Sequence, residues 1–185
     1  MKKLLTSIDQ EDFTKLIKST LKTKFKVAFL LGYGAGLRIS EIVGAYRKDG
    51  TIIEALTKER VYINEKKILI EQAKGRSDRI VPLPKGFKNY MLDYLPLNKS
   101  YKTIPSARRS LQRAFKTAAY KAGLLIRNPR LHFHSLRHGF GTRMADQGIP
   151  IHHIKTLMGH SNISTTNVYL DSNPKLALES YENLF

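Results

Sequence analysis

Two stretches of this chain carry its most informative patterns: LMGHSNISTTNVYL at residues 157–170 and HSLRH at residues 134–138. In the first stretch a glycine is expected to end one helix, and the serine and threonines that follow can cap the next. The pattern predicts two helices joined by a turn, with His160 at the turn and Tyr169 on the second helix, nine positions later.

The stretch HSLRH places a histidine and an arginine one helical turn apart. His134 and Arg137 are three positions apart, so at the start of a helix they share one face. Such a pair, taken alone, is more often a pair of surface residues than a catalytic site. The context along the chain therefore decides its meaning.

The chain as a whole is strongly basic. Its 185 residues carry 32 Lys and Arg against 15 Asp and Glu, a formal net charge of +17. A positive field of this strength attracts polyanions, and nucleic acid is the commonest polyanion in cells. Charge alone fits a structural RNA-binding protein as well as an enzyme. The length is sufficient for one domain with a real hydrophobic core.

The composition also excludes several classes of site. There is no cysteine, so disulfides, thiolate nucleophiles and cysteine-based zinc sites are ruled out. The longest apolar run, residues 27–37, is too short to span a bilayer. The amino-terminal residues MKKLLTSIDQ lack the apolar core of a secretory signal. We therefore expect an intracellular, cytoplasmic protein that does not associate with membranes.

The order of patterns predicts a mainly α-helical domain with one small antiparallel sheet of three strands. Ser7 and Gln10 resemble a capping box for a first helix, whose apolar positions extend to Leu21. Strands are expected at residues 61–64, 67–72 and 79–83, with Lys74 near the second turn. Helices are expected over residues 25–34, from residue 38 onward, and over residues 85–95, 105–122, 135–147, 151–158, 163–170 and 174–183.

Five motifs, in this order, resemble those of the tyrosine recombinases, the family of phage-type integrases and Xer resolvases. They are GLRISE at 36–41, AKG at 73–75, HSLRH at 134–138, MGH at 158–160, and Tyr169. The match extends from about Leu5 to the carboxyl end. The resemblance implies the fold of a tyrosine recombinase catalytic domain. It also implies an enzyme that needs no cofactor and that cleaves and rejoins DNA strands through a 3′-phosphotyrosine intermediate.

Six residues are the candidate catalytic residues: Arg38, Lys74, His134, Arg137, His160 and Tyr169. Tyr169 would attack the phosphodiester and displace the 5′ oxygen. Arg38 and Arg137 would each hold a nonbridging phosphate oxygen through their planar guanidinium groups, which stabilises the charge of the transition state. This chemistry needs no metal ion, because the arginines supply the positive charge.

Proton transfer falls to the remaining candidates. Lys74 would protonate the leaving 5′ oxygen, with Arg76 and Arg79 as rivals for that role. His134 would exchange a proton with the tyrosine, and His160 would hydrogen-bond the phosphate.

Two further residues are expected to support this group. Glu41 would orient Arg38, although the two could also form a simple ion pair three positions apart on one helix. His138 is expected to play a supporting role inside the domain. The spacing of His134 and His138 could bind a metal, but no carboxylate or cysteine completes a ligand set, so no metal site is expected. The expected DNA-binding residues are Arg76, Arg79 and Lys155.

The chain is expected to be a single catalytic domain over residues 1–185, with a tail helix over residues 173–185 and without the amino-terminal clamp domain of most family members. The resemblance implies double-stranded DNA as partner and a homotetramer on that DNA. The segment 46–55 lengthens the link to the sheet and has no assigned function. Two alternatives stay open: a type IB topoisomerase that relaxes DNA, and a non-catalytic DNA-binding regulator.

Overall fold

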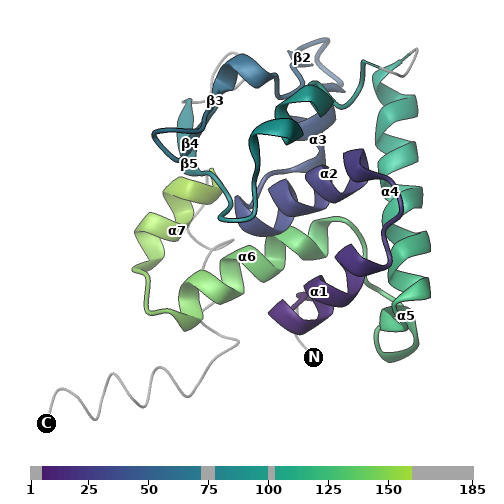
Figure 1. The fold of residues 1–185 in the computed structure, drawn as a ribbon. Helices are drawn as coiled ribbons and strands as arrows, with labels where there is room; N and C mark the ends of the chain where they lie inside the picture. Colours follow the sequence, from purple (N-terminus) through teal and green to yellow (C-terminus); the bar gives the residue numbers. More distant parts are fainter. Residues whose placement is uncertain (1–5, 72–77, 100–102, 160–185) are drawn as a thin grey trace, which may run out of the picture.

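The computed structural model describes residues 6–71, 78–99 and 103–159, and it is mainly helical (Figure 1). The α-helices are α1 (Gln10–Lys18), α2 (Thr23–Gly34), α3 (Ile39–Val43), α4 (Ile104–Lys121), α5 (Leu124–Arg127), α6 (His134–Asp146) and α7 (Ile151–Met158). Two 3₁₀ helices are η1 (Lys58–Arg60) and η2 (Asn89–Tyr94). The strands are β1 (Ala45–Tyr46), β2 (Ile52–Ile53), β3 (Val61–Tyr62), β4 (Lys67–Ile70) and β5 (Arg79–Pro82).

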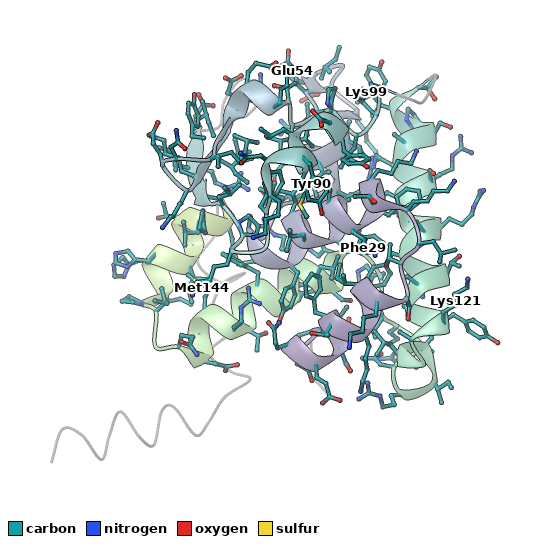
Figure 2. All side chains as sticks on the ribbon, viewed as in Figure 1. Phe29, Glu54, Tyr90, Lys99, Lys121 and Met144 are labelled. Carbon is teal, nitrogen blue, oxygen red and sulfur yellow. The ribbon has the colours of Figure 1, made fainter. Side chains whose placement is uncertain are left out.

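Helix α2 forms the centre of the core, because it is apolar on nearly all sides and is covered by α1, α4, α6 and η2. Phe29 of α2 is fully buried and lies 5.7 Å, between ring centroids, from Phe115 of α4. A third ring, Phe133, lies 6.0 Å from Phe29, directly before α6. Figure 2 shows Phe29 in the middle of the molecule and Lys121 projecting outward from α4. The aromatic contacts thus fix the start of α6, which carries the HSLRH stretch.

The expected three-stranded antiparallel sheet is present, in the order β3-β4-β5. Ile68 of β4 pairs with Val81 of β5, and both side chains are buried. Alternate residues of each strand therefore face the core, as period-two patterning predicts. The segment 46–55 contributes to a separate hairpin of β1 and β2, in which Tyr46 pairs with Ile52.

Helix α7 packs beside β5 and α6 (Figure 1). Its buried residues Ile154 and Met158 join Phe140 and Ala145 of α6 in a second, smaller apolar cluster. Met144 of α6 packs against this cluster and lies between the two helices (Figure 2). This packing directs the carboxyl end of α7 toward β5.

Several predicted boundaries were wrong for local reasons. Helix α1 is capped by Asp9, whose carboxylate accepts the Asp12 N–H at 2.8 Å, and not by Ser7. The chain leaves this helix at Ser19, so Leu21 is 82% exposed and not part of an apolar face. The helix predicted over 85–95 is only the 3₁₀ helix η2, because prolines at 84 and 96 confine it. The predicted helices over 163–170 and 174–183 lie outside the described residues.

Candidate active site

The carboxyl end of α7 is the point where the candidate residues meet. Gly159 ends the helix in the left-handed conformation, with φ of 60°. The last carbonyls of a helix have no partner within it and carry its partial negative charge, so they attract cations. Three arginines from other elements donate to three consecutive carbonyls: Arg79 Nε to Leu157 O at 2.9 Å, Arg137 Nη2 to Met158 O, and Arg38 Nη2 to Gly159 O at 2.8 Å.

Arg38 occupies the N-cap position of α3 and is held there by Glu41. Its backbone N–H donates to Glu41 Oε2 at 2.8 Å, and its Nη1 donates to Glu41 Oε1 at 2.9 Å. The expected Arg38–Glu41 pair is therefore present. The side chain of Arg38 is 25% exposed, so it is partly open to solvent.

Glu41 is buried, with 7% of its side chain exposed, and it bonds a second arginine. Arg79 Nη1 donates to Glu41 Oε1 at 3.0 Å and Arg79 Nη2 to Glu41 Oε2 at 2.9 Å, a two-pronged pair. Burial by itself raises the pKa of Glu41. The hydrogen bonds and charge of Arg79, followed by the charges of Arg38 and Arg137, outweigh that effect and hold this pKa at about 2. Glu41 is therefore an anion shared between two cations.

Arg79 is not at the surface, where a DNA-binding arginine was expected to lie. Only 5% of its side chain is exposed, and its three nitrogens donate to Glu41 and to the Leu157 carbonyl. The alternation of β5 carried a signal for this burial, because Arg79 lies two positions from the buried Val81.

Arg137 of α6 is the most buried charged residue of the group, with 1% exposure. Its Nη2 bonds Met158 O, and its Nη1 donates to the carbonyl of Gly36, in the turn between α2 and α3. Arg137 thus connects the motif at 36–41 with the end of α7. Charge-assisted bonds to two carbonyls compensate for burial of the cation.

Gly36 gives a direct test of this turn. Its φ is +66°, and a Cβ added there would lie 2.6 Å from Cδ1 of Phe140. A Gly36→Ala variant is therefore expected to lose about 2–4 kcal/mol of folding free energy, from backbone strain and overpacking together. Urea unfolding followed by circular dichroism measures this loss. Gly50→Ala is the matched control, because Gly50 also has positive φ (80°) but no atom lies within 4 Å of the added Cβ. Equal losses in the two variants would contradict the packing argument.

His134 and His138 lie at the start of α6, with ring centroids 4.8 Å apart. Burial is the largest cause that lowers the pKa of His134, to about 3, and the charges of His138 and Arg137 lower it further. Burial likewise lowers the pKa of His138 to about 4, together with the charges of His132 and Arg137. Both imidazoles are neutral at pH 7, so His134 is in the protonation state that can accept a proton.

These shifts predict acid sensitivity in two pH windows. Between pH 6.5 and 5 the unfolded chain protonates His134 and His138 while the folded chain does not, so folding stability falls by about 3 kcal/mol, and this loss continues until the pH reaches the folded-state pKa values of about 4 and about 3. Below pH 4.5 the unfolded chain also protonates Glu41, and stability falls by about 3 kcal/mol more as the pH approaches 2. Urea unfolding at half-unit pH steps measures both windows. A Glu41→Gln variant should lose the Glu41 part of the decrease below pH 4.5 and keep the part that comes from the two histidines. Constant stability from pH 7 to 5 would contradict the histidine assignment.

Of the remaining candidates, Lys155 lies within the described residues and four others do not. Lys155 is on α7 and half-buried, within reach of solvent. Within residues 6–71, 78–99 and 103–159, no cluster of histidines and carboxylates could hold a metal ion. Four of the sequence-predicted residues lie outside the described residues: Lys74, Arg76, His160 and Tyr169. His160 directly follows Gly159 in the sequence, so the arginine-bound helix end leads straight into it.

Comparison with known proteins identifies the class of this chain. Residues 3–175 match the model of the phage integrase family. Over 182 residues the chain is 34% identical to the tyrosine recombinase XerA of Thermococcus onnurineus. This alignment covers 91% of this chain and 58% of that protein. Among solved structures, one similar chain is the XerH site-specific recombinase bound to palindromic difH substrate in a post-cleavage complex. Its TM-score is 0.72 and its sequence identity is 19%, and the match covers 97% of this chain and 53% of that one.

The catalytic domain of bacteriophage HP1 integrase is also similar, with a TM-score of 0.61 and 23% identity, over 92% of this chain and 94% of that chain. The chain therefore belongs to the phage integrase family, and its fold is that of a tyrosine recombinase catalytic domain. It spans a little over half the length of the XerA relative. In the part of the chain that the structure describes, no helix is long and apolar enough to cross a membrane.

Proposed function

We propose that this chain is the catalytic domain of a site-specific DNA recombinase that cuts and rejoins strands through a 3′-phosphotyrosine at Tyr169. The observation that carries the proposal is the pairing of Arg38 and Arg137 on the consecutive carbonyls of Met158 and Gly159. Consecutive Cα atoms are about 3.8 Å apart along the chain, so both guanidinium groups are anchored at the same end of α7. That arrangement suits a single phosphate group held by two cations.

The charges and protonation states support a metal-independent transfer of the phosphoryl group. Arg38 is the member of the pair that is open to solvent, so an incoming phosphate would meet it first. Arg137 would add a second fixed cation beside it, and together they would stabilise the developing charge on the phosphate. Neutral His134 would accept the phenolic proton of Tyr169 as the tyrosine oxygen bonds to phosphorus and the 5′ oxygen leaves. Lys74 would protonate that leaving oxygen.

Strand joining is the reverse of the same step. A 5′-hydroxyl of another strand attacks the phosphotyrosine, the tyrosine leaves, and the phosphodiester bond is restored. Because the phosphotyrosine conserves the bond energy, neither ATP nor a cofactor is required. The net charge of +17 favours association with double-stranded DNA, and a tetramer on DNA is part of this proposal. An intracellular site, in the cytoplasm, follows from action on DNA.

The test uses DNA whose target sequence is selected by the protein itself. The chain is incubated with a pool of duplexes that carry one nick and a randomised sequence around it, so that a short cleaved strand diffuses away and traps the enzyme. Complexes that survive denaturation in SDS are recovered and their DNA is sequenced. We expect an adduct with a blocked 3′ phosphate, a free 5′-hydroxyl and a preferred sequence. Binding without any adduct across the pool would contradict the proposal and favour a regulator. Adducts without sequence preference, with relaxation of supercoiled DNA, would favour a topoisomerase.

A further inference from the structure

We propose that Arg79 is a positioning residue of the active site, which holds Glu41 and the end of α7 so that Arg38 presents a correctly oriented guanidinium group to DNA. This inference rests on the proposed function. It starts from a feature of β5 outside the five motifs, a buried arginine whose side-chain hydrogen bonds go to Glu41 and to the end of α7.

The geometry connects three elements that are far apart in the sequence. Arg79 comes from β5, Glu41 from α3, and Leu157 from the last turn of α7, 78 positions after Arg79. All three nitrogens of the guanidinium group are used, two on the carboxylate and one on the carbonyl. The planar fork of arginine therefore fixes the plane of the Glu41 carboxylate relative to the end of α7.

Arg79 and Arg38 compete for the carboxylate of Glu41, and this competition determines how the side chain of Arg38 is bonded. Arg79 occupies both carboxylate oxygens, so the side chain of Arg38 makes one bond to Glu41, through Nη1, and turns Nη2 to Gly159 O. Without Arg79, Glu41 could take both prongs of Arg38 and neutralise its charge, because a two-pronged pair is the stronger geometry. Arg79 thus keeps the positive charge of Arg38 available to a phosphate.

The charge balance of the buried group leads to the same conclusion. Arg38, Arg79 and Arg137 surround one carboxylate, Glu41, so the four groups carry a net positive charge. Two cations would remain to offset the charge of a bound phosphate, and removal of Arg79 would leave one. Lost charge and lost orientation would both slow phosphoryl transfer, whereas few phosphate contacts to the surrounding DNA would change.

The test compares Arg79→Ala and Arg79→Lys with the unmodified chain on the DNA recovered from the selection. The first-order rate of adduct formation is measured at saturating DNA, and the dissociation constant is measured separately by fluorescence anisotropy. Arg79→Ala is expected to cleave about 10²-fold more slowly, the cost of a misplaced catalytic group, while binding DNA within threefold of the unmodified chain. Arg79→Lys, which keeps the charge but loses the fork, should cleave about tenfold more slowly and covers the case in which the alanine variant does not fold.

Two controls separate positioning from general stability. Arg60→Ala removes another arginine that pairs with two carboxylates, Glu54 and Glu71, instead of with Glu41 and the end of α7, and it should leave the cleavage rate unchanged. Added methylguanidinium should restore the rate of folded Arg79→Ala at least fivefold and leave Arg60→Ala unaffected. Normal cleavage by both Arg79 variants, or an equal loss of binding and cleavage, would overturn this inference alone. A complete failure of the unmodified chain to form an adduct would overturn the proposed function and this inference together.

Discussion

An Arg137→Lys variant is expected to form the covalent DNA adduct about 10²–10³-fold more slowly than the unmodified chain, which is the usual cost of losing one charge-stabilising group in a transition state. Lysine keeps the charge but presents a single ammonium group. It cannot donate to both Gly36 and Met158 carbonyls and still reach a phosphate in the geometry of a fork. DNA affinity should change by less than about threefold, because one phosphate contact is a small part of a basic interface.

Lysine is a sharper choice than alanine at this position because Arg137 is buried. Alanine would leave the carbonyls of Gly36 and Met158 without their donor, at about 1–3 kcal/mol each, and would mix lost folding with lost catalysis. Single-turnover cleavage is the measurement, with folding checked by circular dichroism. A matched control is Arg130→Lys, because Arg130 is an exposed arginine that is not one of the three arginines bound to the end of α7. A normal cleavage rate in Arg137→Lys would contradict a catalytic role.

The second large effect is expected at Tyr169. A Tyr169→Phe variant removes only the phenolic oxygen, so it cannot bond to phosphorus, and the adduct should disappear to below about 10⁻⁴ of its normal rate. Folding and DNA binding should persist, because the change is close to isosteric. The selected nicked duplex, SDS gels and anisotropy measure the three properties. Tyr120→Phe serves as control, since Tyr120 is a tyrosine of α4 that is 72% exposed. An adduct formed by Tyr169→Phe would exclude this tyrosine as the only nucleophile.

Sequence patterns predicted most of the architecture, because the elements that carry it are strongly periodic. The helices near 105–122, 135–147 and 151–158 and the three-stranded sheet all lie close to their expected positions. The patterns failed where short-range rules compete: at the Asp9 cap, and between the two prolines around η2. The short helix α5 was also missed, since a single turn has no periodicity to detect.

The candidate site was predicted as a set of residues but not as a structure. The motifs predicted the Arg38–Glu41 contact, because three positions on one helix bring side chains together. They did not predict that the arginines bind backbone carbonyls, since Gly159 lies 121 positions from Arg38 and a carbonyl has no signature in the sequence. Arg79 was predicted to be a DNA-binding residue at the surface. Its burial depends on the packing of β5 against α7, which the residue type does not reveal.

We expect Tyr169 to form a covalent linkage with a 3′ phosphate of DNA. Its most direct test is mass spectrometry of the nuclease-trimmed and protease-digested adduct formed on the selected nicked duplex. The expected result is a single modified peptide, with the nucleotide attached through its 3′ phosphate to the oxygen of Tyr169 and a free 5′-hydroxyl on the released strand. Attachment to any other residue, or through a 5′ phosphate, would contradict it.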